Sequence, residues 1–364
     1  MSIQQEKRNK VTIGLSGGVD SALTAALLQE QDYEVNAVFM QNWDANDPHC
    51  NASIDLSDAR AIADQLGIKL TTVNFSKEYW DNVFSHCLDE FAAGRTPNPD
   101  VLCNREIKFK PLLKTVHQLG STYLATGHYA QILKTKTGFE LHKGIDENKD
   151  QSYFLYLLNQ EQLSQSLFPL GGMRKQDVRE AARKRGLVNA KKKDSTGICF
   201  VGERAFKPFL KEFLTPRPGE IRTENGHLIG QHDGVIFYTL GQRQGLNIGG
   251  TRGSNGAPWY VIDKDVQNNI LVVAQNANHP RLLRTECTLT HVHWISGIKP
   301  HPLFSCNSKM RYRHLDQGCT VNLLDNNMAR VHFNTHQRAL TPGQSVVFYE
   351  GTQCLGGGII TSFL

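Results

Sequence analysis

The first 200 residues alternate short apolar runs with longer segments of helical pattern. The apolar runs predict strands at Val11–Leu15, Glu34–Met40, Ile68–Phe75 and Thr122–Ala125. The segments between them predict helices at Ser21–Glu30, at Leu56–Leu66 and from Ser76 to about Ala93. Gly67 stands where a helix end favours glycine, and Ser76 is the expected N-cap of the third helix. Strands that alternate with helices predict a doubly wound parallel α/β sheet, in which ligands bind at the carboxyl ends of the strands.

The pattern changes after residue 215, where Pro216, Pro218 and Gly219 mark a boundary. Short β-type runs follow, separated by the turn pairs Asn225-Gly226 and Asp233-Gly234. A hairpin is expected from Trp259–Asp263 and Asn269–Ala274. From about residue 285 the runs are short and β-branched, and breaks are expected at Gly297, Pro300, Gly318, Asn326-Asn327 and Gly343. We therefore predict an α/β domain over residues 1–215, a central mostly-β domain over 216–284, and a C-terminal β-barrel over 285–364.

Composition excludes several classes of protein. A chain of 364 residues is too long for one ordinary core, and 40% hydrophobic with 21% charged residues is typical of globular domains. No apolar run approaches the ~18 residues that a membrane helix needs. The first ten residues, MSIQQEKRNK, have no apolar stretch of the kind found in a secretory signal. We therefore expect a cytoplasmic protein without a membrane association.

The formal net charge of +5 is unevenly distributed. Residues 281–364 carry eight basic and four acidic side chains, and residues 174–193 carry nine basic and two acidic ones. Such concentrations favour an anionic macromolecule as partner. The alternative for residues 174–193 is a solvated helix face followed by a loop.

The eight cysteines show no local pattern, since the closest two, Cys306 and Cys319, are 13 positions apart. No CxxC pair or zinc-ligand spacing occurs. Scattered cysteines in a reducing compartment are usually buried small apolar residues, which is the default reading for each of them.

The strongest candidate for chemistry is the segment Gly14-Leu15-Ser16-Gly17-Gly18-Val19-Asp20-Ser21, between a predicted strand and a predicted helix. Its adjacent glycines allow a tight turn and a close approach of the backbone to a ligand. The two hydroxyls and the free N–H groups of the following helix form a cradle for an anion. No Gly-Lys-Ser/Thr follows and no G-x-G-x-x-G occurs, so neither a Walker A loop nor a dinucleotide fingerprint is present.

This SGG-x-DS segment resembles the motif of the PP-loop ATP pyrophosphatases, whose sheets are Rossmann-like. The resemblance implies that the loop binds the pyrophosphate of ATP while a nucleophile attacks the α-phosphate. Asp20 would then help to hold Mg²⁺ or orient the phosphates, because a hard cation prefers carboxylate and phosphate oxygens.

Two further segments carry a cysteine beside charged residues. Residues 96–109, TPNPDVLCNREIKF, place Asp100 three positions before Cys103, where a carboxylate can exchange a proton with a thiol. Residues 194–200, DSTGICF, place Cys199 after Lys191–Lys193, whose charges would favour a reactive thiolate. Each cysteine taken alone is still more simply read as structural.

Together with ATGHYA at 125–130, GIDENKDQSYFLY at 144–156 and DSTGICFVGER at 194–204, these motifs closely resemble the tRNA-specific 2-thiouridylases, the MnmA family. The resemblance extends to YTLGQRQGLNIGG at 238–250 and KMRYRH at 309–314. It implies ATP-dependent 2-thiolation of the wobble uridine (position 34) of tRNA. The base is adenylated, sulfur arrives from a persulfide on Cys199, and Cys103 resolves it, which leaves a Cys103–Cys199 disulfide with Asp100 as proton shuttle.

The resemblance also implies roles for further residues. The ATP site would comprise Gly14, Leu15, Ser16, Gly17, Gly18, Val19, Asp20, Ser21, Met40 and Gly127. The target base would contact Asn98, Pro99 and Asp100. Contacts with tRNA would come from His128, Lys149, Asp150, Gln151, Arg311, Tyr312 and Gln344. A loop over residues 190–204 would close when tRNA binds, so that Cys199 reaches Cys103.

The implied partners are tRNAs for Lys, Glu and Gln, and a sulfur-relay carrier or a cysteine desulfurase as sulfur donor. The implied cofactors are ATP and Mg²⁺, without a resident protein-bound metal. Three alternatives remain at this stage. They are another PP-loop enzyme such as an amidotransferase-type synthetase or a tRNA lysidine synthetase, an iron–sulfur protein with Asp100, Cys103 and Cys199 as ligands, and a non-catalytic RNA-binding protein.

Overall fold

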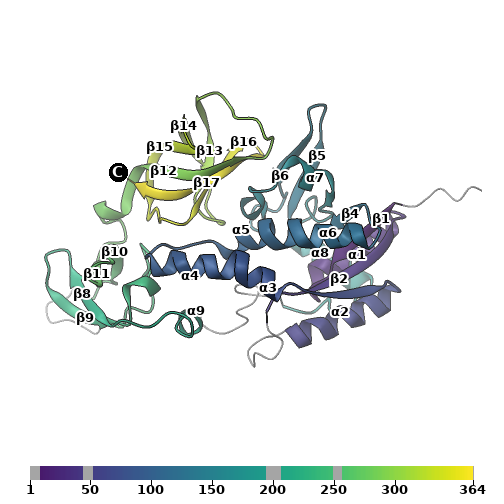
Figure 1. Ribbon diagram of the computed structural model, residues 1–364, viewed down its shortest axis with the longest axis horizontal. Coiled ribbons are helices and arrows are strands. Elements are labelled where there is room, and N and C mark those ends of the chain that lie inside the picture. The colour runs from purple at the N-terminus through teal and green to yellow at the C-terminus, as the bar shows by residue number, and fades with distance from the viewer. Residues whose placement is uncertain (1–8, 44–51, 194–205, 249–255, 364) are drawn as a thin grey trace, which may run out of the picture.

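The computed structural model describes residues 9–43, 52–193, 206–248 and 256–363. Within these ranges the chain forms an α/β sheet, a small central sheet and a barrel. The α/β sheet and the small central sheet lie at opposite ends of the long axis, and the barrel lies to one side between them (Figure 1). No helix in the described ranges is both long and apolar enough to cross a membrane.

The first sheet is parallel, with the strand order β3-β2-β1-β4-β7. Its strands are β1 (Lys10–Gly14), β2 (Glu34–Gln41), β3 (Leu70–Asn74), β4 (Tyr123–Ala125) and β7 (Ser166–Leu167). The four predicted strands are thereby confirmed, within two residues at each end. The short edge strand β7 was not predicted, because two residues leave no periodicity to recognise.

Helices cover both faces of this sheet, as the predicted doubly wound architecture requires. On one face the core contains α1 (Val19–Glu30), α2 (Ala52–Leu66) and α8 (Lys175–Lys184), packed on Val11 and Ile13 of β1. On the other face, Val38 and Leu124 pack with the helical segments between residues 76 and 118. Gly67, with a φ of +63°, follows α2 as predicted.

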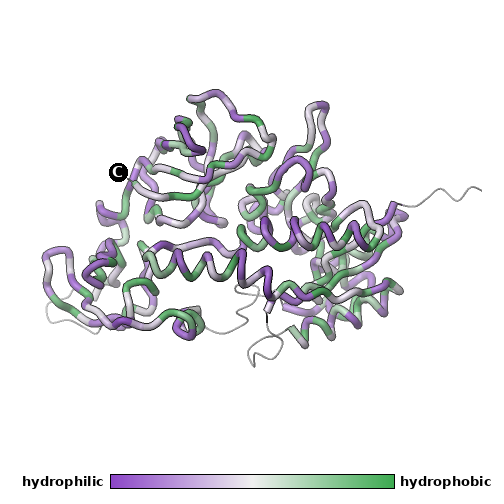
Figure 2. Tube along the Cα trace, viewed as in Figure 1, coloured by the Kyte–Doolittle hydropathy of each residue, from purple (hydrophilic) through white to green (hydrophobic). Residues whose placement is uncertain are grey.

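The helical segments on the second face form two long, slightly irregular rods. The first comprises α3 (Ser76–Tyr79), the π-helical turn η1 (Trp80–Phe84) and α4 (Ser85–Ala92), and the second comprises α5 (Pro99–Cys103), the π-helical η2 (Asn104–Leu112) and α6 (Leu113–Gln118). Hydrophobic and hydrophilic residues alternate along the first rod, as expected for a helix with one buried face (Figure 2). The prediction that Ser76 is the N-cap is wrong. Ser76 is already helical, and its N–H and hydroxyl both bond to the side-chain oxygen of Asn74.

The central sheet has the order β10-β11-β8-β9. Its strands are β8 (Gly219–Thr223), β9 (Leu228–His232), β10 (Tyr260–Asp265) and β11 (Ile270–Ala274). The expected hairpin is confirmed, since β10 and β11 pair antiparallel, and Gly226, with a φ of +82°, forms the turn between β8 and β9.

The C-terminal sheet closes on itself, because β12 pairs with both β15 and β17. Its six barrel strands are β12 (Leu283–Trp294), β13 (Leu303–Lys309), β14 (Gln317–Leu324), β15 (Met328–Arg338), β16 (Ser345–Glu350) and β17 (Gln353–Phe363). The predicted barrel is confirmed, and Asn326 and Asn327 form a turn with φ values of +57° and +53°. The break expected at Gly318 is wrong, because this glycine lies inside β14.

A hairpin from the first part of the chain extends the barrel sheet. Strands β5 (Ala130–Lys134) and β6 (Phe139–Lys143) pair with each other, and β6 pairs with β17 through Leu141 and Cys354. The sequence pattern did not predict this connection. The remaining short helices are η3 (Ser152–Leu155), α7 (Gln160–Ser164), α9 (Phe206–Leu210), η4 (Val235–Phe237) and η5 (Pro280–Leu282).

Candidate active site

The glycine loop lies at the carboxyl end of β1 and leads into α1. Gly18 is the N-cap of α1 without a side-chain cap, which leaves N–H groups of the first turn available to a ligand. Gly17 has a φ of +75°, and a Cβ atom there would lie 2.6 Å from the carbonyl oxygen of Asp55. Ser21 Oγ accepts the N–H of Ser16 at 3.2 Å and donates to the carbonyl of Gly18 at 3.1 Å. These bonds hold the loop in a concave shape whose unpaired donors fit a phosphate group.

Asp20, in the first turn of α1, is paired with a cation from α8, a helix that is distant in the sequence but adjacent in space. Lys175 Nζ lies 2.7 and 2.8 Å from the two carboxylate oxygens of Asp20. Tyr129 donates its hydroxyl to the same carboxylate at 2.8 Å. The sequence analysis did not identify Lys175 or Tyr129. The signal for Lys175 was its place in the basic run 174–193.

Met40 and Gly127 lie on the same edge of the sheet as the loop. Met40 is near the end of β2, and Gly127 follows β4. A Cβ atom on Gly127 would lie 3.1 Å from backbone atoms of Asp20 and Ser21, so a larger residue there would push the two loops apart by a few tenths of an ångström. The predicted ATP residues are therefore brought together at the carboxyl ends of β1, β2 and β4.

The TPNP segment starts the helix that carries Asp100 and Cys103. Asn98 caps α5 by accepting the N–H of Val101 at 3.3 Å, and Pro99 occupies the first helical position. Asp100 is half-buried in the first turn and Cys103 is 2% exposed one turn later. Asp100 and Cys103 therefore lie on the same side of one helical turn. The helix continues as a π-helix, a form often found at functional sites.

Two opposing effects act on the pKa of Asp100, and two concordant ones on the pKa of His128. Burial raises the pKa of the Asp100 carboxyl, while the positive charge of Lys108 opposes that rise. His128 is buried against the rings of Phe109 and Phe168, and this burial, reinforced by Lys108, holds the pKa of its imidazole well below the ordinary value. His128 is thus neutral at pH 7 and bonds to Thr126 Oγ1 at 2.7 Å. The expected contact of His128 with tRNA stays a prediction, and a neutral imidazole would make it through a hydrogen bond or ring packing.

Residues 149–151 pack behind the Gly127–Tyr129 loop. Gln151 accepts the N–H of Tyr129 at 2.9 Å with its side-chain oxygen. Asp150 is 2% exposed and accepts bonds from the N–H groups of Gly144 and Ser152 and from Lys309 Nζ. The Asp150 carboxylate is therefore engaged inside the protein, whereas Lys149 is half-buried at the surface.

The predicted tRNA residues of the barrel differ in exposure. Arg311 donates to the carbonyl of Ala339 at 3.1 Å, and burial lowers the pKa of its guanidinium. The Tyr312 ring packs against Phe154 with centroids 4.7 Å apart. Arg313 is exposed, and its guanidinium carbon lies 5.9 Å from the centroid of the Tyr312 ring. Gln344 bonds to the backbone of Thr96, within the segment that carries Asn98 and Asp100.

The cysteines of the described ranges differ in their surroundings. Cys199 and Cys50 lie outside the described residues, as does most of the proposed closing loop. Cys87, Cys287 and Cys354 are buried core residues, and burial raises the pKa of each thiol. Cys306 and Cys319 face each other across β13 and β14, with their sulfurs 3.7 Å apart. The structure thus brings Asp100 and Cys103 together, and it leaves the placement of Cys199 a prediction.

Two buried amides near the site were also missed by the sequence analysis. Asn104, next to Cys103, donates to the carbonyl of Phe154 at 3.0 Å, and Asn189 donates to the carbonyl of Gly17 at 3.0 Å. The side-chain oxygens of both have no hydrogen-bond partner among the described residues. Both amides fix backbone around the site, and no local pattern marks such long-range bonds in a sequence.

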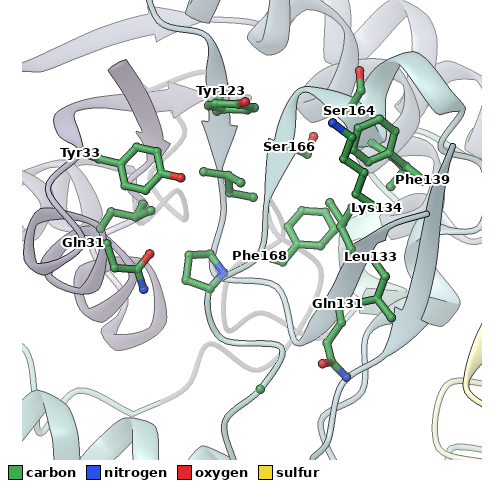
Figure 3. A pocket seen from close by; sticks show the side chains of 16 residues that line it. Gln31, Tyr33, Tyr123, Gln131, Leu133, Lys134, Phe139, Ser164, Ser166 and Phe168 are labelled. Atoms are coloured by element: carbon green, nitrogen blue, oxygen red, sulfur yellow. The ribbon is translucent and has the colours of Figure 1, made fainter. Parts of the chain in front are cut away.

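A cavity of about 440 Å³ lies away from this site (Figure 3). Tyr33 and Tyr123, at the amino ends of β2 and β4, line it together with Phe168, Leu133 and Lys134. Ligands of doubly wound sheets bind at the opposite, carboxyl edge. This cavity is therefore separate from the glycine loop.

Protein-family models match most of the chain. Residues 9–203 match the tRNA methyl transferase HUP domain, residues 207–275 the tRNA methyl transferase PRC-barrel domain, and residues 284–360 the aminomethyltransferase beta-barrel domain. A solved U34-tRNA thiolase NcsA from Methanococcus maripaludis is similar over 50% of this chain and 58% of that chain. Its sequence identity with this chain is 21% and the TM-score is 0.34.

Curated relatives match almost from end to end. The tRNA-specific 2-thiouridylase MnmA of Coxiella burnetii (strain RSA 493 / Nine Mile phase I) is 58% identical over 98% of this chain and 99% of its own length. The enzymes of the same name from Methylobacillus flagellatus and Francisella tularensis subsp. novicida are 53% and 52% identical, over 98% and 97% of this chain and 100% and 99% of their own lengths. With the glycine loop and the Asp100–Cys103 helix in place, this similarity shows that the chain belongs to the tRNA-specific 2-thiouridylase family.

Proposed function

We propose that this protein is an enzyme that replaces O2 of the wobble uridine (position 34) of tRNA with sulfur, at the expense of ATP. The observation that carries the proposal is the loop Gly127–His128, which touches both halves of the site. Gly127 packs on Asp20 and Ser21 of the glycine loop, and His128 packs on Phe109 in the helix that follows Cys103. The positive charge of Lys108, next to Phe109, influences the pKa of both His128 and Asp100, so a nucleotide on the glycine loop and a base beside Asp100 would lie in the same region of the site.

In the first step, O2 of the uridine attacks the α-phosphate of ATP and pyrophosphate leaves. The glycine loop and the first turn of α1 bind the pyrophosphate portion, and Asp20 contributes the carboxylate that a Mg²⁺ ion on the phosphates would prefer. Bound Mg²⁺ would neutralise charge on the phosphates. The product is a base that carries an adenylyl group on O2. AMP, which departs with this oxygen, is a far better leaving group than the original carbonyl oxygen.

In the second step, the terminal sulfur of a persulfide on Cys199 bonds to C2 as AMP departs. The Cys103 thiolate then attacks the inner sulfur on Cys199, and the bond between the two persulfide sulfurs breaks. The outer sulfur keeps the electron pair and remains on C2 as the thiocarbonyl, and a Cys103–Cys199 disulfide is left for a thiol reductant. Dividing one difficult substitution into two easier ones is the usual logic of covalent catalysis.

Asp100 is the proton-transfer group of this scheme. Its raised pKa moves the carboxyl toward neutral pH, where it can both accept and donate a proton. Asn98 and Pro99 hold the base at the start of α5. We further propose the division into domains 1–215, 216–284 and 285–364, with the barrel holding the tRNA through its basic side chains.

The partners follow from the same proposal. The substrates would be tRNAs for Lys, Glu and Gln, with a uridine splayed out of the anticodon loop at a modest cost in stacking. A sulfur-relay carrier or a cysteine desulfurase would load Cys199, and the reaction would take place in the cytoplasm.

Mass spectrometry of tRNA nucleosides tests the function. Wild-type protein with ATP, a persulfide donor and uridine-34 tRNA should yield 2-thiouridine, and Cys103→Ser and Cys199→Ser should yield none. Methylated uridine instead of thiouridine would contradict the proposal, as would unchanged thiolation by Cys199→Ser. Iron analysis of anaerobically purified protein separates the iron–sulfur alternative, since iron bound in stoichiometric amounts would support it.

A further inference from the structure

The glycine loop has no cation of its own. Asp20 is the only charged residue between Gly14 and Ser21, and its charge is negative. A pyrophosphate group bound there would place several negative charges beside this carboxylate. Helix N-termini supply only partial positive charge, roughly half an elementary charge. A Mg²⁺ ion that arrives with the phosphates would offset part of this charge, and a full positive charge from another element of the protein would favour binding further.

Lys175 is in the position to supply it. Its Nζ atom bridges both oxygens of Asp20, at 2.7 and 2.8 Å, from a sequence distance of 155 residues. The Lys175 side chain is 11% exposed and that of Asp20 is 33% exposed. Asp20 thus forms the solvent side of the pair, which is where a ligand of the loop arrives.

The fold holds Lys175 in this position through several contacts. Lys175 is the first residue of α8, and its N–H donates to Asp146 Oδ2 at 2.8 Å. Tyr129 donates its hydroxyl to the Asp20 carboxylate, and its ring centroid lies 5.8 Å from Lys175 Nζ. Lys175 joins the first turn of α8 to the first turn of α1, and Arg185 joins the end of α8 to Glu30 at the end of α1. The two helices therefore run parallel, and both begin at the glycine loop.

We propose that Lys175 is the phosphate-binding cation of this site. It neutralises Asp20 before the nucleotide binds, and it contacts the pyrophosphate portion of ATP afterwards, in the place that a Walker A lysine takes within its own loop. A purely structural role would explain the Lys175–Asp20 pair less well, because partly buried ion pairs contribute little to the net free energy of unfolding. The inference rests on the proposed function for its ligand, ATP, and concerns the binding step alone.

Calorimetric binding to the full chain tests this role, with Mg²⁺-pyrophosphate and AMP as the two probes. AMP lacks the β- and γ-phosphates, so a residue that contacts only these groups should not affect it. Lys175→Gln keeps a hydrogen-bond donor for Asp20 and removes the charge. We expect it to weaken pyrophosphate binding by about tenfold or more and AMP binding by less than about twofold.

Arg185→Gln is the matched control, since it removes the other ion pair between the same two helices. It should leave both affinities within about twofold of wild type. Unchanged pyrophosphate binding by Lys175→Gln would overturn the inference, and so would an equal loss of AMP and pyrophosphate binding, which indicates a distorted loop. If Lys175→Gln does not fold, Lys175→Arg is measured instead, because it retains the positive charge. Loss of this variant's binding of Mg²⁺-pyrophosphate without loss of AMP binding would be compatible only with a geometric requirement for lysine, and equal loss of both would count against the role. A protein that passes these tests but produces no thiouridine would refute the proposed function and leave this inference standing.

Discussion

The side-chain amide of Gln344 donates a hydrogen bond of 2.8 Å to the carbonyl of Thr96, across 248 positions of the sequence. The same amide lies 3.3 Å from the carbonyl of Pro97, and the N–H of Thr96 donates to the carbonyl of Pro342 at 2.9 Å. The barrel therefore holds the segment that leads into Asn98, Asp100 and Cys103. Gln344, expected from the sequence to contact tRNA, has a positioning role in this geometry.

Replacement of Gln344 by Ala separates positioning from RNA binding. The lost bonds loosen the residues before α5, so we expect kcat for thiolation to fall about tenfold, while the Kd for tRNA changes by less than about twofold. Single-turnover thiolation and filter binding measure the two quantities. Gln353→Ala, a glutamine of strand β17, serves as the control and should change neither. A raised Kd with unchanged kcat would identify Gln344 as an RNA contact instead.

Gly343, next to Gln344, is expected not to tolerate alanine. Its φ is +92°, and a Cβ atom there would lie 2.8–2.9 Å from backbone atoms of Thr96. Gly343→Ala should lower the free energy of unfolding by more than about 2 kcal/mol, because backbone strain and a steric clash combine. Gly351→Ala is the matched control, since Gly351 has a φ of +56° with no atom within 4 Å of the added Cβ. Urea unfolding of both variants checks this, and equal losses would show that the clash is relieved.

The sequence predicted the parts of the site that depend on local patterns. The strand, the two glycines and the helix of residues 11–30 are contiguous, so their geometry follows from turn and capping preferences. The start of α5 is equally local, because Asn98 and Pro99 are preferred cap and first-turn residues.

The missed features depend on contacts between residues far apart in the chain. The pairs Lys175–Asp20 and Gln344–Thr96, and the pairing of β6 with β17, join segments that only the folded topology brings together. Lys175 was visible as one charge in a basic run, and such a run does not reveal which of its members turns inward. Asp150 was also misjudged by its local pattern, because this charged residue lies in a polar segment and is nevertheless only 2% exposed.

The pH dependence of thiolation should report Asp100. Burial raises the pKa of its carboxyl and the Lys108 charge lowers it, so removing that charge by Lys108→Met should raise the pKa further. If the carboxylate is the active base, the acidic limb of the kcat/KM profile starts above the ordinary carboxyl range in wild type and moves to higher pH in Lys108→Met. Lys114→Met, in α6, is the control and should leave the limb in place. A shift to lower pH would exclude Asp100 as the base.

A single turnover without reductant should link Cys103 to Cys199. Peptide mapping after alkylation should find this disulfide only when ATP, tRNA and a loaded persulfide are all present. The peptides of Cys306 and Cys319 are an internal control, because their sulfurs are already 3.7 Å apart and any oxidation there should not depend on tRNA. A Cys103–Cys199 link formed equally without tRNA would disconnect the disulfide from catalysis.

Arg313 and Arg311 should differ in their effects on tRNA binding. Arg313 is exposed beside the Tyr312 ring, so Arg313→Ala should weaken tRNA binding and reduce the slope of log K against log salt by about one, as expected for one lost phosphate contact. Arg311 is half-buried and bonded to the carbonyl of Ala339, so Arg311→Ala should mainly reduce the free energy of unfolding, by about 1–3 kcal/mol. Binding isotherms between 50 and 200 mM salt and urea unfolding measure both effects. If Arg311→Ala changes the salt slope and Arg313→Ala does not, then the barrel presents its buried arginine to the RNA, which requires the segment between β13 and β14 to rearrange on binding.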